Sequence, residues 1–187
     1  ETYAGEPLSL TLYYDTAQTK DEGLGRGFRH SFMNRIQQVD PGVWGVFFGE
    51  GTSIFFGEGK DGKLYSQRPS LNTLVQKNKG FWYYDPELMQ ALEYDPEGRL
   101  AAEYIQGIET RRLLYDQGFL TKIQDIHGCF FDFAYEDKHV KKITDNAGRY
   151  VQLDYQGDLL TGLRICLESG APWKDLYDCR EYRTPNK

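Results

Sequence analysis

Tyrosines recur about every twenty residues through the second half of the chain. The steps between them are 21, 20, 20 and 22 residues, and the five positions are Tyr94, Tyr115, Tyr135, Tyr155 and Tyr177. A glycine follows thirteen residues after each of the first three and fifteen after the fourth, at Gly107, Gly128, Gly148 and Gly170. A period of this length is typical of stacked supersecondary units, none of which can bury its hydrophobic face alone. The sequence therefore predicts a repeat scaffold.

Each unit has the pattern of two short strands. An apolar residue stands two positions before each of the first four tyrosines, at Leu92, Leu113, Phe133 and Leu153. The run Phe131-Phe133-Tyr135 extends this alternation upstream, which is the period of a strand with one buried face. A second apolar run follows each turn, at Leu120 and Ile123, Val140 and Ile143, and Leu160 and Leu163.

Turn residues separate these runs. The first turn is Tyr94-Asp95-Pro96-Glu97-Gly98-Arg99-Leu100, which has Asp, Pro and Gly at positions where a type I turn favours these residues. Residues 125–128 and 145–148, at the other end of the unit, also have Asp at the first turn position and Gly at the fourth. The glycines and the β-branched and aromatic residues between turns oppose a helix. We expect an all-β fold of consecutive antiparallel hairpins in an extended curved sheet. The alternative is an ordinary meander whose tyrosines coincide by chance.

The first of these turns carries a family resemblance. Residues 94–100 resemble the signature of the RHS, or YD-repeat, family, and residues 23–32, Gly-Leu-Gly-Arg-Gly-Phe-Arg-His-Ser-Phe, resemble the segment that commonly opens such proteins ahead of their repeats. Only the first unit has the full motif. Tyr115-Asp116 begins a turn that is one residue shorter, and Tyr135-Glu136 and Tyr155-Gln156 lack the Asp.

The resemblance implies a function. RHS repeats coil into a curved sheet that closes as a shell around a C-terminal cargo, often a toxin, in secreted or surface proteins of bacteria. It implies that this chain is part of such a wall, a segment of a longer protein, with the rest of its own chain as partner and no catalytic residue. Asp95-Pro96-Glu97-Gly98 matches the self-cleaving motif of some members as a string, but it lies inside the first repeat, so we do not assign proteolysis to it.

A binding module for glycan or protein on the cell surface is the alternative function, with Trp44, Trp82 and Trp173 as candidate stacking residues. An enzyme would need convergent polar groups in a cleft, and the sequence offers no such cluster.

The first half reads as a β meander over residues 1–80 that caps the repeats of residues 81–187, the last of which is cut short after Tyr177. Leu8, Leu10, Leu12 and Tyr14 alternate as a one-sided strand, a glycine-rich bend follows at residues 23–27, and Asp61-Gly62 is a hairpin signal. Terminal units of repeat arrays are atypical because an open edge must be covered. An open edge also predicts self-association through edge strands.

Charge and hydropathy exclude several partners. The formal net charge is −6 and the isoelectric point is about 5.1, which disfavours nucleic acid and anionic membranes. No run approaches the ~18 apolar residues that a membrane span needs.

Three further sequence features are better explained by a structural role than by a binding or catalytic one. Residues 57–62 match the dinucleotide fingerprint, but no helix is expected after them and Asp61-Gly62 serves better as a turn. His127 and Cys129 lack the second ligand pair of a metal site. Cys166 and Cys179 either form a disulfide or pack as thiols. We therefore expect no cofactor, no metal and no catalytic residue.

Overall fold

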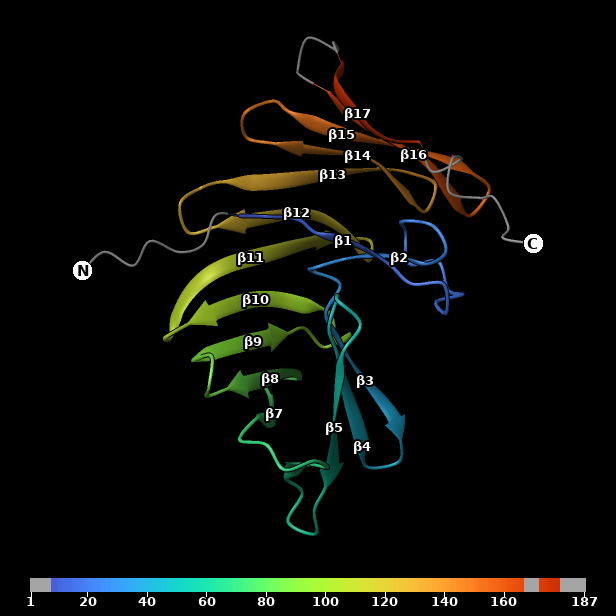
Figure 1. Cartoon of the computed structure of the whole chain (residues 1–187). Helices are drawn as coiled ribbons and strands as arrows, with labels where there is room; N and C mark the ends of the chain where they lie inside the picture. Colours follow the sequence, from blue (N-terminus) through green and yellow to red (C-terminus); the bar gives the residue numbers. More distant parts are fainter. Residues whose placement is uncertain (1–7, 167–171, 179–187) are drawn as a thin grey trace.

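The computed structural model describes residues 8–166 and 172–178, and every regular element in these residues is a β-strand (Figure 1). The strands of the first half are β1 (Leu12–Tyr14), β2 (Phe28–His30), β3 (Arg35–Asp40), β4 (Val43–Phe47), β5 (Ser53–Glu58), β6 (Leu64–Ser66), β7 (Thr73–Lys77), β8 (Gly80–Asp85) and β9 (Gln90–Tyr94). Those of the second half are β10 (Leu100–Ile105), β11 (Ile108–Asp116), β12 (Phe119–Asp125), β13 (Phe130–Glu136), β14 (His139–Asp145), β15 (Tyr150–Gln156), β16 (Leu159–Cys166) and β17 (Pro172–Asp178).

One antiparallel sheet of fifteen strands contains β3 to β17, each paired with the next strand in sequence. β1 and β2 form a separate two-stranded sheet. The predicted all-β fold of consecutive hairpins is confirmed. The boundary expected at residue 80 falls at the start of β8, and β7, β8 and β9 pair continuously across it. Within the described ranges, no helix is long and apolar enough to cross a bilayer.

A one-residue irregularity explains how each hairpin buries its apolar residues. The pairing shifts register immediately before Tyr115, Tyr135 and Tyr155. Leu120 and Ile123 are three positions apart, a spacing that would place them on opposite faces of a regular strand. The bulge turns both inward, and they are 7% and 0% exposed. A β-bulge also bends its strand and increases the local twist.

The face that carries Leu113, Phe133 and Leu153 is called the inner face. These side chains are buried and lie opposite Ile123, Ile143 and Leu163 on the neighbouring strands. Burying an aliphatic or aromatic side chain contributes about 1.5–3 kcal/mol relative to leaving it exposed. The row runs through successive hairpins, so the repeats share one continuous core.

The predicted Asp-x-x-Gly turns share one geometry. In each, the glycine amide donates to the carbonyl of the aspartate, at 2.9 Å for Gly98 and 3.1 Å for Gly128 and Gly148. The aspartate Oδ1 accepts from the amide four residues later, at 2.8 to 2.9 Å. These two hydrogen bonds to the aspartate close the turn, and neither uses a side chain at the two central positions.

The sheet rolls back on itself between β3 and β10. Figure 1 shows β3, β4 and β5 running steeply across the direction of β8 to β12. The amide of Ile36 donates to the carbonyl of Gly98 at 2.7 Å, and the amide of Leu100 donates to the carbonyl of Asn34 at 3.2 Å. The roll encloses a core whose buried members include Ile36, Val46, Phe56, Leu74 and Tyr94.

The N-terminal segment lies against the inner face of the later repeats, rather than extending the meander. Of the strand expected over Leu8–Tyr14, only Leu12–Tyr14 pairs, and its partner is β2. Leu8, Leu10 and Leu12 nevertheless pack against the core. The His30 ring lies 5.7 Å from that of Phe133, so the segment reaches repeats about a hundred residues further along the chain.

Candidate functional site: a clasp between the N-terminal loop and the hairpin ends

The repeat tyrosines join each hairpin to the one before it. The hydroxyl of Tyr115 donates to the carbonyl of Leu100, and that of Tyr155 donates to the carbonyl of Val140, both at 2.8 Å and both fifteen residues back. Tyr135, which lies between them in the sequence, also has a hydrogen bond with the backbone at Leu120. Burial raises the pKa of all three phenols, to about 12 for Tyr135, so the hydroxyls remain donors. The tyrosine thus has a specific linking role beyond covering neighbouring strands.

The other predicted repeat positions lie on strands or in turns wherever the structure describes them. Tyr94 is 2% exposed on β9. Gly107, Gly128 and Gly148 occupy turns, and each has a positive φ. Tyr177 lies on β17, where only the backbone is described, and Gly170 and Cys179 lie outside the described residues.

The glycine-rich loop of residues 23–27 docks on the tyrosine-bearing ends of two hairpins. The amide of Val140 donates to the carbonyl of Gly23, and the amide of Arg26 donates to the carbonyl of Asp158, both at 2.8 Å. Leu24 is completely buried between these contacts. At Gly25, where φ is +84°, a Cβ atom would lie 2.9 Å from the amide nitrogen of Leu160. Glycine is required there because the two backbones approach so closely.

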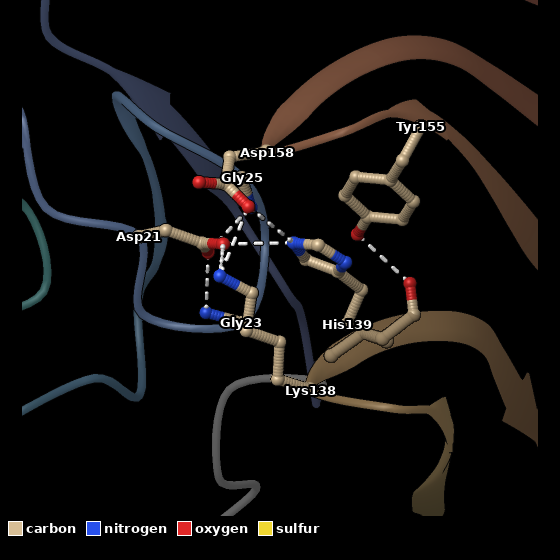
Figure 2. Close-up of polar contacts among 8 residues, drawn as sticks. Asp21, Gly23, Gly25, Lys138, His139, Tyr155 and Asp158 are labelled. Carbon is tan, nitrogen blue, oxygen red and sulfur yellow. Dashed lines mark hydrogen bonds and ion pairs between the residues drawn. The ribbon is translucent and has the colours of Figure 1, made fainter.

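An ionic cluster locks this loop in place, and Figure 2 shows its geometry. Asp21 Oδ1 accepts from the amides of Gly23 at 2.9 Å and Gly25 at 3.0 Å. Asp21 Oδ2 lies 2.7 Å from His139 Nε2 and 3.3 Å from Lys138 Nζ. Lys138 Nζ also lies 2.9 Å from Asp158 Oδ1. We call Asp21, Lys138, His139 and Asp158 the clasp.

Burial and hydrogen bonding oppose each other at Asp21. Its side chain is 6% exposed, and burial alone would raise the pKa of the carboxyl group. Hydrogen bonds from the loop amides, His139 and Lys138 outweigh burial and lower that pKa. The carboxylates of Asp158 and Asp21 in turn raise the pKa of Lys138. The clasp is therefore a site of concentrated negative charge that is partly balanced by one ammonium group.

The neighbouring tyrosine fixes the imidazole. The rings of His139 and Tyr155 stack at 4.4 Å between centroids with an interplanar angle of 17°. His139 is 12% exposed, whereas Asp158 is 48% exposed and faces solvent. The donor atoms of Asp21, His139 and Asp158 lie within 4.8 Å of one another. This arrangement can hold a cation, and nothing in it resembles a nucleophile with a general base.

Sequence reasoning did not find the clasp. Asp21 and His139 are 118 residues apart, and the glycines of residues 23–27 indicated only a bend. The one signal in the sequence was the Asp21-x-Gly23-x-Gly25 spacing, which suits a carboxylate that accepts from two following amides. That signal does not identify the partners on the repeats.

The other strings weighed from the sequence have structural roles. The amides of His127 and Cys129 both donate to Asp125 Oδ1, which makes these residues part of a turn. Residues 57–62 span the end of β5 and the turn into β6, so this glycine string leads into a strand. Cys166 is buried at the end of β16, and Cys179, with which a disulfide was considered, is outside the described residues.

No protein-family model matches this sequence, and a search of curated proteins found no match. The resemblance to the RHS family therefore stays a prediction.

Proposed function

We propose that the chain is a structural segment of a secreted or surface RHS-type protein, forming part of a β-shell that encloses or presents a C-terminal, toxin-like domain. The supporting observation is the repeated bond from a tyrosine hydroxyl to the carbonyl fifteen residues earlier, at Tyr115 and again at Tyr155. Such a bond joins one hairpin to the next through groups that every repeat can supply, so further units can be added without a new kind of interface. The protein acts as a wall and not as an enzyme.

The N-terminal segment fits this role as an internal lining. A bare sheet would leave the inner row of Leu113, Phe133 and Leu153 in water. The buried side chains of Leu24 and Phe32 cover that row together with Leu10 and Leu12. The clasp fixes the lining to the hairpin ends, so this part of the wall is covered by residues of its own chain.

Limited proteolysis of the full-length polypeptide tests this proposal. The C-terminal domain should resist added protease in the intact protein and become sensitive when the hairpins of residues 108–166 are deleted. The isolated domain, digested under the same conditions, provides the control for intrinsic resistance. Equal digestion of the domain with and without the hairpins would contradict an enclosing wall.

A glycan-binding surface is the second candidate, and a row of aromatic rings on the outer face favours it. Trp82 lies between buried Phe81 and Tyr83 on β8 and therefore points to the opposite face. Its ring lies 6.1 Å from Tyr84 and 5.1 Å from Tyr104. Rows of aromatic faces suit stacking on sugar rings.

The other two tryptophans do not add to this row. Trp44 packs 4.5 Å from Phe81 against the core, and the side chain of Trp173 lies outside the described residues. Glycan-array binding that disappears in Trp82→Ala and survives in Tyr65→Ala, a change of another exposed aromatic residue, would support this candidate. Absence of binding by the parent chain would remove it.

A further inference from the structure

Three metal-ligating side chains meet in the clasp from three separate segments. Asp21 comes from the loop before β2, His139 begins β14 and Asp158 lies in the turn between β15 and β16. His139 Nε2 lies 2.7 Å from Asp21 Oδ2 and 4.0 Å from Asp158 Oδ1. These are separations that one ion with bonds of about 2.0–2.2 Å to each ligand can bridge after small side-chain adjustments.

Two of the three donors are already oriented. The amides of Gly23 and Gly25 occupy Asp21 Oδ1, which leaves Oδ2 directed at the imidazole (Figure 2). Stacking on Tyr155 holds the plane of His139. Ligand side chains in metal sites are generally fixed by such outer contacts. Asp158 is half-exposed and offers the route by which an ion would enter.

Lys138 independently indicates that a cation belongs at this point. Its ammonium group lies between the two carboxylates, 3.3 Å from Asp21 and 2.9 Å from Asp158. The Lys138 side chain is 56% exposed, so it can withdraw into water at little cost. A divalent ion in its place would balance both carboxylates and also use the imidazole nitrogen, which an ammonium ion does not coordinate.

We propose that the clasp is a Zn²⁺ site with Asp21 Oδ2, His139 Nε2 and Asp158 Oδ1 as protein ligands, completed by water. A mixed imidazole and carboxylate set suits Zn²⁺ better than Mg²⁺ or Ca²⁺, which prefer oxygen ligands alone. On binding, Nε2 gives up its hydrogen bond to Asp21 and presents its lone pair, with the imidazole proton on Nδ1, and the ammonium of Lys138 moves to solvent. The ion then ties the N-terminal loop to two successive hairpins. This site is independent of the proposed wall function, because the clasp would bind Zn²⁺ whether or not the sheet encloses a cargo.

Isothermal titration of the untagged chain with ZnCl₂ tests the proposal. We expect one Zn²⁺ per chain, at least tenfold weaker binding in Asp158→Asn and His139→Gln, and at least tenfold tighter binding in Lys138→Ala. Lys142→Ala is the matched control for the lysine, because it removes the same charge from β14, and the Lys142 ammonium lies over the Tyr150 ring and not over a residue of the clasp or over Tyr155. Its affinity should stay within twofold of the parent.

Two further measurements distinguish the clasp from a cysteine-ligated site and from adsorption of Zn²⁺ elsewhere on the acidic surface. Co²⁺ in place of Zn²⁺ should give the visible spectrum of nitrogen and oxygen ligation, without a thiolate charge-transfer band, and Cys129→Ala should bind as the parent does. Zn²⁺ should also raise the melting temperature of the parent but not of Asp158→Asn, which substitutes a half-exposed turn residue and is expected to fold. Unchanged or weaker affinity in Lys138→Ala, loss of binding in Cys129→Ala, or no binding by the parent would each overturn the proposal.

Discussion

Replacing Gly98 by alanine should reveal how strongly the rolled start of the sheet is held to the repeats. The backbone at Gly98 has a φ of +79°, which costs a residue with a Cβ about 1–2 kcal/mol. An added Cβ would lie only 2.2 Å from the carbonyl oxygen of Ile36. The neighbouring backbone must therefore move, and the bonds from Ile36 to Gly98 and from Leu100 to Asn34 would break.

The expected loss of stability is the sum of two costs, the broken hydrogen bonds and the overpacking by the added Cβ. Each lost hydrogen bond costs about 0.5–1.5 kcal/mol, and overpacking costs about 1–3 kcal/mol. Gly128→Ala is the matched control, because its turn has the same bonds and a φ of +83° but nothing lies within 4 Å of the added Cβ. We expect Gly98→Ala to lower the free energy of unfolding by about 2–6 kcal/mol more than Gly128→Ala does.

Equilibrium unfolding in urea, followed by circular dichroism, measures both changes. Hydrogen exchange at the Ile36 amide provides a local readout, since this amide should lose protection in Gly98→Ala and keep it in Gly128→Ala. Equal losses of stability in the two variants would refute the idea that β3 is fixed to the turn between β9 and β10.

Two other predictions concern buried polar groups. Tyr155→Phe should destabilise the chain by about 1–2 kcal/mol in the same unfolding assay, because it removes the hydroxyl that donates to the carbonyl of Val140. The control is Tyr14→Phe, at a residue that is 64% exposed, which should change stability by less than about 0.5 kcal/mol. Equal effects of the two substitutions would contradict the linking role of the repeat hydroxyl. Burial lowers the pKa of His30 from 6.5 to about 3. Between these pH values the unfolded chain binds a proton at His30 and the folded chain does not. The free energy of unfolding should therefore fall by about 1.4 kcal/mol per pH unit as the pH drops from 6.5 to about 3. His30→Asn, whose side-chain oxygen can still accept from the Phe32 amide, should show a shallower slope than the parent between these pH values, and an unchanged slope would rule out His30 as its source.

Local patterns allowed the hairpins to be predicted from the sequence. The alternation around Phe133, the Asp-x-x-Gly turns and the tyrosine spacing each specify geometry within about twenty residues, and the observed strands follow them. The expected strand over Leu8–Tyr14 was too long, because its first residues pack by their side chains against the sheet without pairing.

The long-range contacts could not be predicted in the same way. β3 meets the turn at Gly98 through main-chain groups, which every residue has, so no side chain marks the contact. The clasp joins Asp21 to His139 across 118 residues through side-chain types that are common on any surface. Only folding brings these groups together, and a single sequence does not record which distant groups meet.

The bulge before Tyr115, Tyr135 and Tyr155 has a consequence for longer proteins built in this way. Since the same kink recurs at the same place in each unit, the sheet should curve by a similar amount with every hairpin added. Gaining or losing a whole unit would then lengthen the arc while leaving its radius nearly constant. The size of any enclosed space would be set by the shape of one repeat, and the degree of closure by how many repeats there are.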